Sequence, residues 1–164
     1  MQGYQKTKIV VLANMQNYSI KFGTTEDIQA IAQFQVDMAM ESEGTALDMD
    51  VVVRGVTHAM EDKNKGTYVI AHADGKAIGS LMLTKEWSDW TDKWYWWIQS
   101  VYVKPEYRGK GVYKAMYNTI KEAAKAENIS QIRLYVDKTN FRAQKVYQKS
   151  GMHESHYLLY EEDI

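Results

Sequence analysis

The stretch "VYVKPEYRGKGVYKAM", residues 101–116, joins a strand-like run to a helix-like pattern through a turn that holds basic residues and glycines. Backbone N–H groups converge at the start of a helix, where the helix dipole favours an anion. Gly109 and Gly111 let the chain turn sharply and approach a phosphate closely, while Arg108 and Lys110 add positive charge. The stretch therefore predicts an anion site, with an ordinary strand–helix turn carrying exposed basic residues as the alternative.

Two common nucleotide-binding motifs do not match this turn. The Walker sequence G-x-x-x-x-G-K-[ST] does not occur in the chain. The Rossmann fingerprint G-x-G-x-x-G fails because Lys114 stands where the third glycine is required. A phosphate site at this turn therefore indicates another kind of protein.

The composition is that of a folded globular protein without cysteine chemistry. The 164 residues fit one domain with a sizeable core, and 45% of them are hydrophobic. Twenty basic against 21 acidic residues leave a net charge of −1, so no basic surplus favours nucleic acid or an anionic membrane as a partner. The absence of cysteine excludes disulfides, thiolate zinc sites and a cysteine nucleophile, and it favours a cytoplasmic protein. The four histidines form no metal-binding pattern, so no metal is predicted.

Hydrophobic patterns along the chain predict a mixed α/β fold around one sheet. Strands are expected at 17–22, on both sides of Asp74-Gly75, and at 98–103, 131–136 and 156–162. Helices are expected from Thr24 or Thr25 to about 41, from Asp48 or Asp50 to 60, and over about 110–127 and 140–151. Residues 1–16 are interpreted as an extra strand or a loosely held arm, and residues 17–164 as a single domain.

Two blocks of the sequence resemble the motifs of one enzyme family. Arg108-x-x-Gly111, where a strand turns into a helix, is similar to the Q/R-x-x-G-x-G/A loop that binds the acyl-CoA diphosphate in the GNAT superfamily of N-acetyltransferases. Asn140-x-x-Ala143-x-x-x-Tyr147, followed by Gly151-Met152, resembles the family's second motif. The order of the expected elements agrees, so the resemblance covers about residues 17–161. It implies a GNAT-like fold, with a central, mostly antiparallel sheet that is splayed at the acyl-CoA site and flanked by helices.

The resemblance implies an acetyl-CoA site made largely of backbone. The strand before the turn would pair with the pantetheine arm, and one of its backbone N–H groups would stabilise the oxyanion. The residues assigned to the cofactor in this way are Val101, Val103, Arg108, Gly109, Lys110, Gly111, Val112, Tyr113, Asn140 and Ala143. Tyr113 departs from the family pattern, which has glycine or alanine at that position, so its ring must point away from the diphosphate.

Tyr147 is the residue that the resemblance marks as catalytic. Its spacing from Asn140 and Ala143 is expected to put all three on one helical face, and the phenol could then protonate the departing thiolate. The attacking amine must be neutral, and no residue is clearly marked as its base. Four acids are candidates for a carboxylate that contacts the amine and assists the loss of its proton. They are Glu41 and Glu43 in the expected loop after the first helix, and Glu86 or Asp89 beside the aromatic run. The alternative for each acid is a solvated loop charge.

The segment "EWSDWTDKWYWWIQS", residues 86–100, holds all five tryptophans. It could form an acceptor pocket that selects a cation with aromatic faces and carboxylates. The alternative is a strand whose rings pack into the core or into a homodimer interface. Trp87 and Trp90 are the better candidates for contact with the substrate.

These features predict an N-acetyltransferase that moves an acetyl group from acetyl-CoA to a primary amine of a small molecule or peptide. Because the chain lacks cysteine, direct attack in a ternary complex is favoured over a cysteine-bound acyl-enzyme. Acetylation of protein N-termini is a different assignment within the same family. A non-catalytic acyl-CoA sensor and a tryptophan-rich ligand-binding module are the alternatives from other classes.

Overall fold

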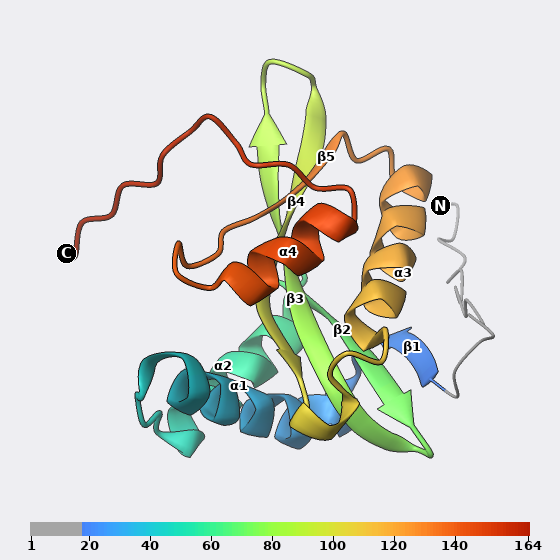
Figure 1. Cartoon of the computed structure of the whole chain (residues 1–164), viewed down its shortest axis with the longest axis vertical. Helices are drawn as coiled ribbons and strands as arrows, with labels where there is room; N and C mark the ends of the chain where they lie inside the picture. Colours follow the sequence, from blue (N-terminus) through green and yellow to red (C-terminus); the bar gives the residue numbers. More distant parts are fainter. Residues whose placement is uncertain (1–17) are drawn as a thin grey trace. The chain divides into compact units, whose positions relative to one another are not determined.

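The structure is a computed structural model that describes residues 18–164 (Figure 1). The chain divides into two compact units, one up to Leu134 and one over Tyr135–Ile164. The first unit contains β1 (Tyr18–Phe22), α1 (Ile28–Glu43), α2 (Met49–Glu61), β2 (Thr67–Ala73), β3 (Lys76–Ser88), β4 (Lys93–Val103), α3 (Val112–Ala126) and β5 (Gln131–Leu134), and the second contains α4 (Phe141–Lys149). The interpretation of residues 1–16 lies outside the described residues, and a single domain over 17–164 stays a prediction.

The first unit is built on a five-stranded mixed sheet with the strand order β1-β2-β3-β4-β5. Strands β1 to β4 are antiparallel neighbours, and the short β5 lies parallel to β4. Asp74 and Gly75 join β2 to β3 with positive φ angles of 47° and 75°, as a tight hairpin requires. The predicted α/β fold with a mostly antiparallel sheet is confirmed.

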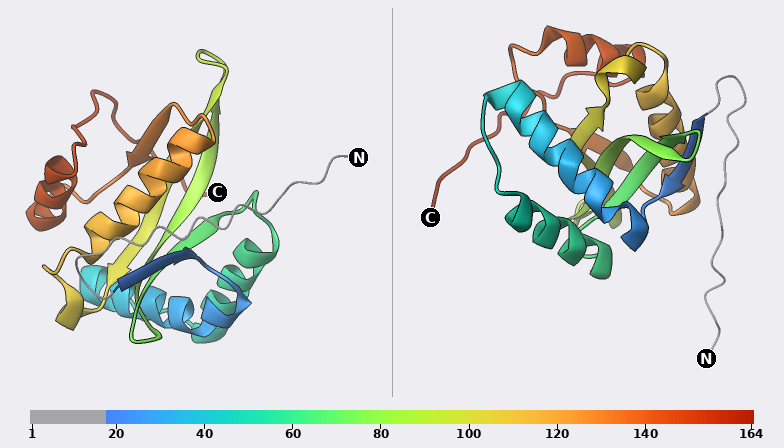
Figure 2. Two further views of the ribbon diagram at one scale, coloured as in Figure 1. Left: turned by 90° about the vertical axis from the view of Figure 1, so that its right-hand side faces the viewer. Right: turned by 90° about the horizontal axis from the view of Figure 1, so that it is seen from below.

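Helices cover both faces of this sheet (Figure 2). On one face, Ile31 of α1 and Ile70 of β2 belong to a buried apolar cluster that also includes residues of α2. On the other face lies α3, whose residues Val112, Met116 and Ile120 recur at helical spacing and are fully buried. Burying each large apolar side chain contributes roughly 1.5–3 kcal/mol, so this packing holds α3 against the sheet.

A buried carboxylate fixes the entry into α1. Asp27 is 5% exposed, and its Oδ2 accepts hydrogen bonds from the Thr24 backbone N–H (2.9 Å) and hydroxyl (3.1 Å). Its Oδ1 lies 3.1 Å from His72 Nε2, and Lys21 Nζ lies 3.5 Å from Oδ2. Burial opposes the charged carboxylate, but Thr24, Lys21 and His72 together hold the pKa of Asp27 below its ordinary value of 3.8.

Asp27→Asn is expected to lower the free energy of unfolding by about 1–3 kcal/mol at pH 7, because the variant loses charge-assisted hydrogen bonds in a buried place. Folding lowers the Asp27 pKa, so this contribution is present above about pH 4 and is lost as the pH falls through the lower pKa of the folded state. Urea unfolding from pH 7 down to pH 2 measures the difference, with the exposed neighbour change Glu26→Gln as the control. If the free energy of unfolding of Asp27→Asn stays below that of the unmodified protein by the same amount from pH 7 to pH 2, the charged role of Asp27 is contradicted.

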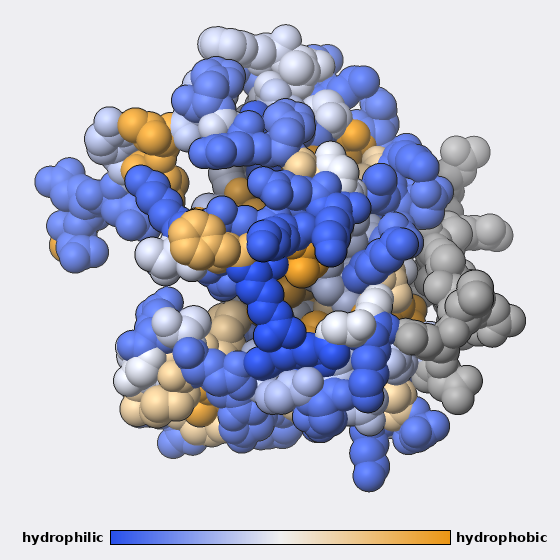
Figure 3. Space-filling view, viewed as in Figure 1, coloured by the Kyte–Doolittle hydropathy of each residue, from blue (hydrophilic) through white to orange (hydrophobic). Residues whose placement is uncertain are grey.

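Residues 135–164 contain α4, and the chain after it forms no strand. The prediction of a strand at 156–162 is therefore wrong. The sequence alternates there, but a strand also needs a hydrogen-bonded neighbour, and no residue from 150 to 164 takes part in strand pairing. Leu158 and Leu159 are instead exposed, at 72% and 64%, and Figure 3 shows hydrophobic side chains on the surface of this segment.

Candidate active site

The turn between β4 and α3 has a backbone conformation that depends on its two glycines. After β4 a short 3₁₀ helix, Pro105–Tyr107, leads into the turn, and α3 begins at Val112. Gly109 and Gly111 have φ angles of 73° and 81°, where a side chain is strained, and a Cβ on Gly109 would meet no atom within 4 Å. Gly111 is the N-cap of α3 and offers no capping side chain. The N–H groups of the first turn of α3 are therefore suited to a bound anion.

Just before this turn, β4 has an unpaired edge. Its pairing with β5 ends at Ile98, whereas its pairing with β3 continues to Val103. Ser100 has a φ of 52°, and the β3–β4 register shifts at the same level, which marks a bulge. Within residues 18–134, the β5-facing edge of β4 from 99 to 103 thus has no strand partner. The sheet is open at the two valines predicted to meet pantetheine.

Arg108 is held by groups outside the turn. Its Nε donates to the carbonyl oxygen of Val103 at 2.7 Å, and its Nη2 donates to Glu41 Oε2 at 2.7 Å. The guanidinium carbon lies 5.4 Å from the centroid of the Tyr102 ring. The structure therefore brings together two predicted site residues, Arg108 and Glu41, and adds Tyr102 to them.

The C-terminal end of α1 carries two of the acids predicted to contact the amine. Glu41 and Glu43 lie in the helix, which ends where Gly44 takes a φ of 65°, so the predicted loop at these two acids is wrong. The Tyr102 hydroxyl donates to Glu41 Oε1 at 3.2 Å. Burial, and next the charge of Glu41, raise the pKa of Tyr102 to about 12. The sequence did not indicate a role for Tyr102, because it is there only an aromatic residue in an expected strand.

The ring of Tyr113 packs along α3. It stacks on Tyr117, one helical turn further on, with ring centroids 5.9 Å apart and 14° between the planes. The Tyr113 backbone N–H meanwhile lies in the first turn of the helix. The departure from glycine or alanine at this position is therefore compatible with anion binding by backbone N–H groups.

In residues 135–164, the second motif forms around a helix cap. Asn140 precedes α4, and its Oδ1 accepts the backbone N–H of Ala143 at 3.0 Å. Asn140 is therefore a capping residue outside the helix, which differs from the predicted shared helical face. Tyr147 lies within α4, and burial raises the pKa of its phenol. The role of Asn140 toward pantetheine stays a prediction.

The tryptophan-rich segment forms the outer end of the β3–β4 hairpin. β2 begins opposite Leu83, and β5 begins opposite Tyr95, which pairs with Glu86, so the hairpin beyond Glu86 and Tyr95 extends past the rest of the sheet (Figure 1). Trp87 packs edge-on against Trp94 with centroids 5.0 Å apart, and Trp90 lies in the turn, 89% exposed. The turn at 108–111 follows the other end of β4. Because β4 has 11 residues and a strand rises roughly 3.3 Å per residue, the tryptophan-rich end of the hairpin is separated from this turn by the length of the strand. Substrate contact by Trp87 and Trp90 stays a prediction.

Two other predicted acids belong to the same hairpin. Glu86 accepts hydrogen bonds from Trp97 Nε1 and from Arg133 Nη1, the latter at 3.2 Å. Asp89 lies in the hairpin turn. Glu86 is thus already engaged, which lessens its suitability as a free base. In the turn between β4 and α3, the Lys110 ammonium lies 5.7 Å from the centroid of the Tyr107 ring.

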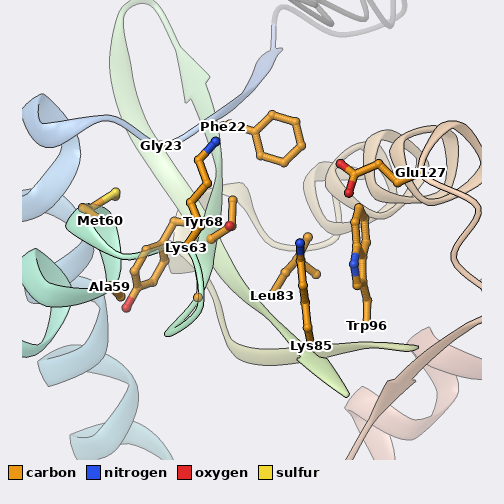
Figure 4. Close-up of a pocket in the computed structure, with 12 residues that line it drawn as sticks. Phe22, Gly23, Ala59, Met60, Lys63, Tyr68, Leu83, Lys85, Trp96 and Glu127 are labelled. Atoms are coloured by element: carbon orange, nitrogen blue, oxygen red, sulfur yellow. The ribbon is translucent and has the colours of Figure 1, made fainter. Parts of the chain in front are cut away.

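A cavity of about 380 Å³ opens near the start of β2 (Figure 4). Its walls include Met60, Tyr68, Leu83, Trp96 and Glu127. None of the residues predicted for the cofactor, the proton donor or the amine lines it. The cavity is therefore distinct from the turn between β4 and α3.

Residues 18–164 contain neither a cluster of metal ligands nor a membrane-spanning helix. This part of the chain has no group of three or more His, Asp or Glu side chains arranged to hold a metal ion. None of its helices combines the length and the apolar character needed to cross a bilayer. The absence of a metal cofactor stays a prediction.

Sequence similarity links these elements to a known protein family. The model of the Acetyltransferase (GNAT) family matches residues 30–152, which is more than half of the chain. The chain belongs to the GNAT family. In this GNAT protein the matched region includes the turn at 108–111 and the whole of α4.

Relatives of this GNAT protein carry acetyltransferase names. An uncharacterized N-acetyltransferase of Archaeoglobus fulgidus is 30% identical over 91 residues, which are 55% of this chain and 62% of that protein. A thialysine N-epsilon-acetyltransferase of Bos taurus is 38% identical over 55 residues, 34% of this chain and 32% of that protein. The chain thus spans less than two thirds of these curated relatives. The solved structure of a possible acetyltransferase from Clostridium difficile 630 is 39% identical, with a TM-score of 0.84 over 91% of this chain and 99% of that one.

Proposed function

We propose that this GNAT protein is an acetyl-CoA-dependent N-acetyltransferase that acts on a primary amine of a small molecule or peptide. The observation that carries the proposal is the unpaired edge of β4, which a short 3₁₀ helix connects to a glycine turn at the N-terminus of α3. An extended pantetheine arm can pair with such an edge as an added strand does. A diphosphate can accept hydrogen bonds from the N–H groups where the helix begins.

The residues that would hold acetyl-CoA contribute mainly through their backbones. Val101 and Val103 lie on the open edge and would orient the thioester. Gly109, Gly111 and the N–H groups that follow them would meet the diphosphate, with the Lys110 ammonium adding positive charge. A site made mainly of backbone groups suits the structure, because the space beside Gly109 is open.

The transfer is a direct displacement at the thioester. The amine nitrogen attacks the carbonyl carbon, the new C–N bond forms, and the C–S bond breaks after a backbone N–H of β4 has stabilised the oxyanion. The thiolate takes its proton from the Tyr147 phenol, and the amine loses a proton to water or a carboxylate. The Tyr147 phenol is protonated at neutral pH, because its ordinary pKa of 10.0 already lies well above 7 and burial raises it further.

A small-molecule amine is the favoured acceptor. The bovine and porcine relatives are named for acetylation of thialysine at its epsilon nitrogen, and they match 34% and 50% of this chain. A flexible aliphatic amine of this kind has a pKa near ~10.4 and must lose a proton before it attacks. The acceptor site should therefore provide a route for that proton.

A non-catalytic acyl-CoA sensor is the second candidate. It is favoured by the fact that two of the candidate bases are occupied: Glu41 by Arg108 and Tyr102, and Glu86 by Trp97 and Arg133. Such a sensor would bind acetyl-CoA and release no thiol. The compartment and the predicted homodimer stay predictions under either function.

Calorimetry with acetyl-CoA, followed by thiol release with a panel of amines, tests the proposal. We expect a dissociation constant in the micromolar range and thiol release that depends on both acetyl-CoA and a primary amine. Mass spectrometry should find the amine heavier by one acetyl group. Binding without turnover on any amine would favour the sensor, and no binding would remove both acyl-CoA functions.

A further inference from the structure

We propose that Glu41 is a positioning residue that, through Arg108 and Tyr102, holds in place the turn at 108–111, where acyl-CoA would bind. The inference rests on the proposed function of that turn. It goes beyond that function by assigning a role to a residue of α1 that lies 67 positions before Arg108 in the chain.

Both oxygens of the Glu41 carboxylate are occupied. Oε2 accepts from Arg108 Nη2 at 2.7 Å, and Oε1 accepts from the Tyr102 hydroxyl at 3.2 Å. A carboxylate engaged on both oxygens is a poor base for an incoming amine. The same two contacts connect the end of α1 to the end of β4 and to the first residue of the turn.

Arg108 extends this connection to the backbone. Its Nε–H donates to the Val103 carbonyl at 2.7 Å, and its guanidinium lies over the Tyr102 ring in a cation–π contact. Tyr102 is 5% exposed and stacks on Phe34 of α1, with centroids 5.3 Å apart. The guanidinium is therefore tied to α1 and β4, and the backbone N–H groups after Arg108 are left to meet the diphosphate.

The strength of the arrangement lies in the combination of its contacts. The side chains of Arg108 and Glu41 are 30% and 43% exposed, and an ion pair this exposed is weak alone. The hydrogen bond from buried Tyr102 and the bond to the Val103 carbonyl limit the freedom of both partners. Together these contacts restrict the turn more than the ion pair could.

Glu41→Gln tests the role, because it removes the charge and keeps the shape of the side chain. The variant is expected to bind acetyl-CoA about 5- to 10-fold more weakly by calorimetry, as loss of a charged hydrogen bond implies. The KM for acetyl-CoA should rise similarly, while kcat and the KM for the amine stay within about twofold. Glu122→Gln is the matched control, since it removes a carboxylate with a 2.7 Å ion pair to Lys125 on the outside of α3. A change in kcat or in the amine KM would show a direct role in the reaction and overturn the inference.

A double variant shows whether Glu41 acts through Arg108. Arg108→Gln alone should weaken acetyl-CoA binding, and adding Glu41→Gln should weaken it by less than a further twofold. If the losses of acetyl-CoA affinity in the two single variants multiply in the double variant, the positioning role is overturned.

Hydrogen exchange without any ligand gives a readout that does not depend on activity. Backbone amides of residues 104–115 should exchange faster in Glu41→Gln than in the unmodified protein, and Glu122→Gln should leave them unchanged. If the unmodified protein does not bind acetyl-CoA, the proposed function fails. The exchange experiment still decides whether Glu41 restrains the backbone of residues 104–115. If the unmodified protein binds acetyl-CoA and Glu41→Gln binds it equally well or more tightly, the positioning role fails and the proposed function stands.

Discussion

Tyr147→Phe is expected to lower kcat for acetyl transfer by about 10²-fold, while the Kd for acetyl-CoA changes less than about twofold. The phenol supplies a proton only as the C–S bond breaks, so its loss should affect the transition state and spare ground-state binding. The effect should stop short of complete inactivation, because a thiol with a pKa near ~8.5 can leave as the thiolate. Thiol release under saturating acetyl-CoA measures kcat, and calorimetry measures the Kd.

Tyr157→Phe is the matched control for this variant. It removes a phenol from the same unit of the chain, at a side chain that is 66% exposed, and should leave kcat unchanged. The pH profile provides a second check. Because burial raises the Tyr147 pKa above its ordinary value of 10.0, deprotonation of this residue should not lower kcat below about pH 10. A Tyr147→Phe protein with full activity would remove Tyr147 as the proton donor.

Gly111→Val is expected to weaken acetyl-CoA binding by about 10²-fold. The φ of 81° at this position lies in the left-handed region, which a β-branched residue adopts only with strain. The turn must therefore change shape, and each charge-assisted hydrogen bond lost from the diphosphate costs about 1.5–3 kcal/mol, where 1.4 kcal/mol is tenfold in affinity. The strain should also lower the free energy of unfolding by about 1–3 kcal/mol. Calorimetry and urea unfolding measure the two effects separately.

Gly75→Val separates strain from binding. Gly75 has a φ of 75° in the β2–β3 hairpin, and a Cβ there would meet no atom within 4 Å. The substitution should therefore cost similar stability while acetyl-CoA binds as in the unmodified protein. Equal losses of affinity in the two variants would mean that binding follows global stability, and it would count against a diphosphate site at Gly111.

Elements that depend on local chemistry could be predicted from the sequence. Asp74-Gly75 specifies a tight hairpin through its positive φ angles, and Asp48 caps α2 by accepting the N–H groups of Asp50 and Val51. The glycines of the turn before α3 can be predicted for the same reason, since glycine adopts positive φ angles without the strain that a side chain brings. Each of these signals is contained within a few residues.

Features that depend on distant partners could not be predicted in this way. The alternating pattern at 156–162 indicates a strand but names no hydrogen-bonding neighbour, and the structure provides none. Glu41 reads as a solvated charge because its partners Tyr102 and Arg108 lie 61 and 67 positions away. The predicted helical face of the second motif failed more locally, since the short polar side chain of Asn140 suits a cap better than a helix interior.

The protruding β3–β4 hairpin determines what intrinsic fluorescence can report. All five indoles lie between positions 87 and 97, with Trp90 89% exposed and Trp96 3% exposed. Acrylamide should quench the first readily and the second hardly at all. Tryptophan emission on heating follows the melting of this hairpin, and α4 contains no tryptophan, so the emission must be compared with circular dichroism before a single Tm is assigned to the chain.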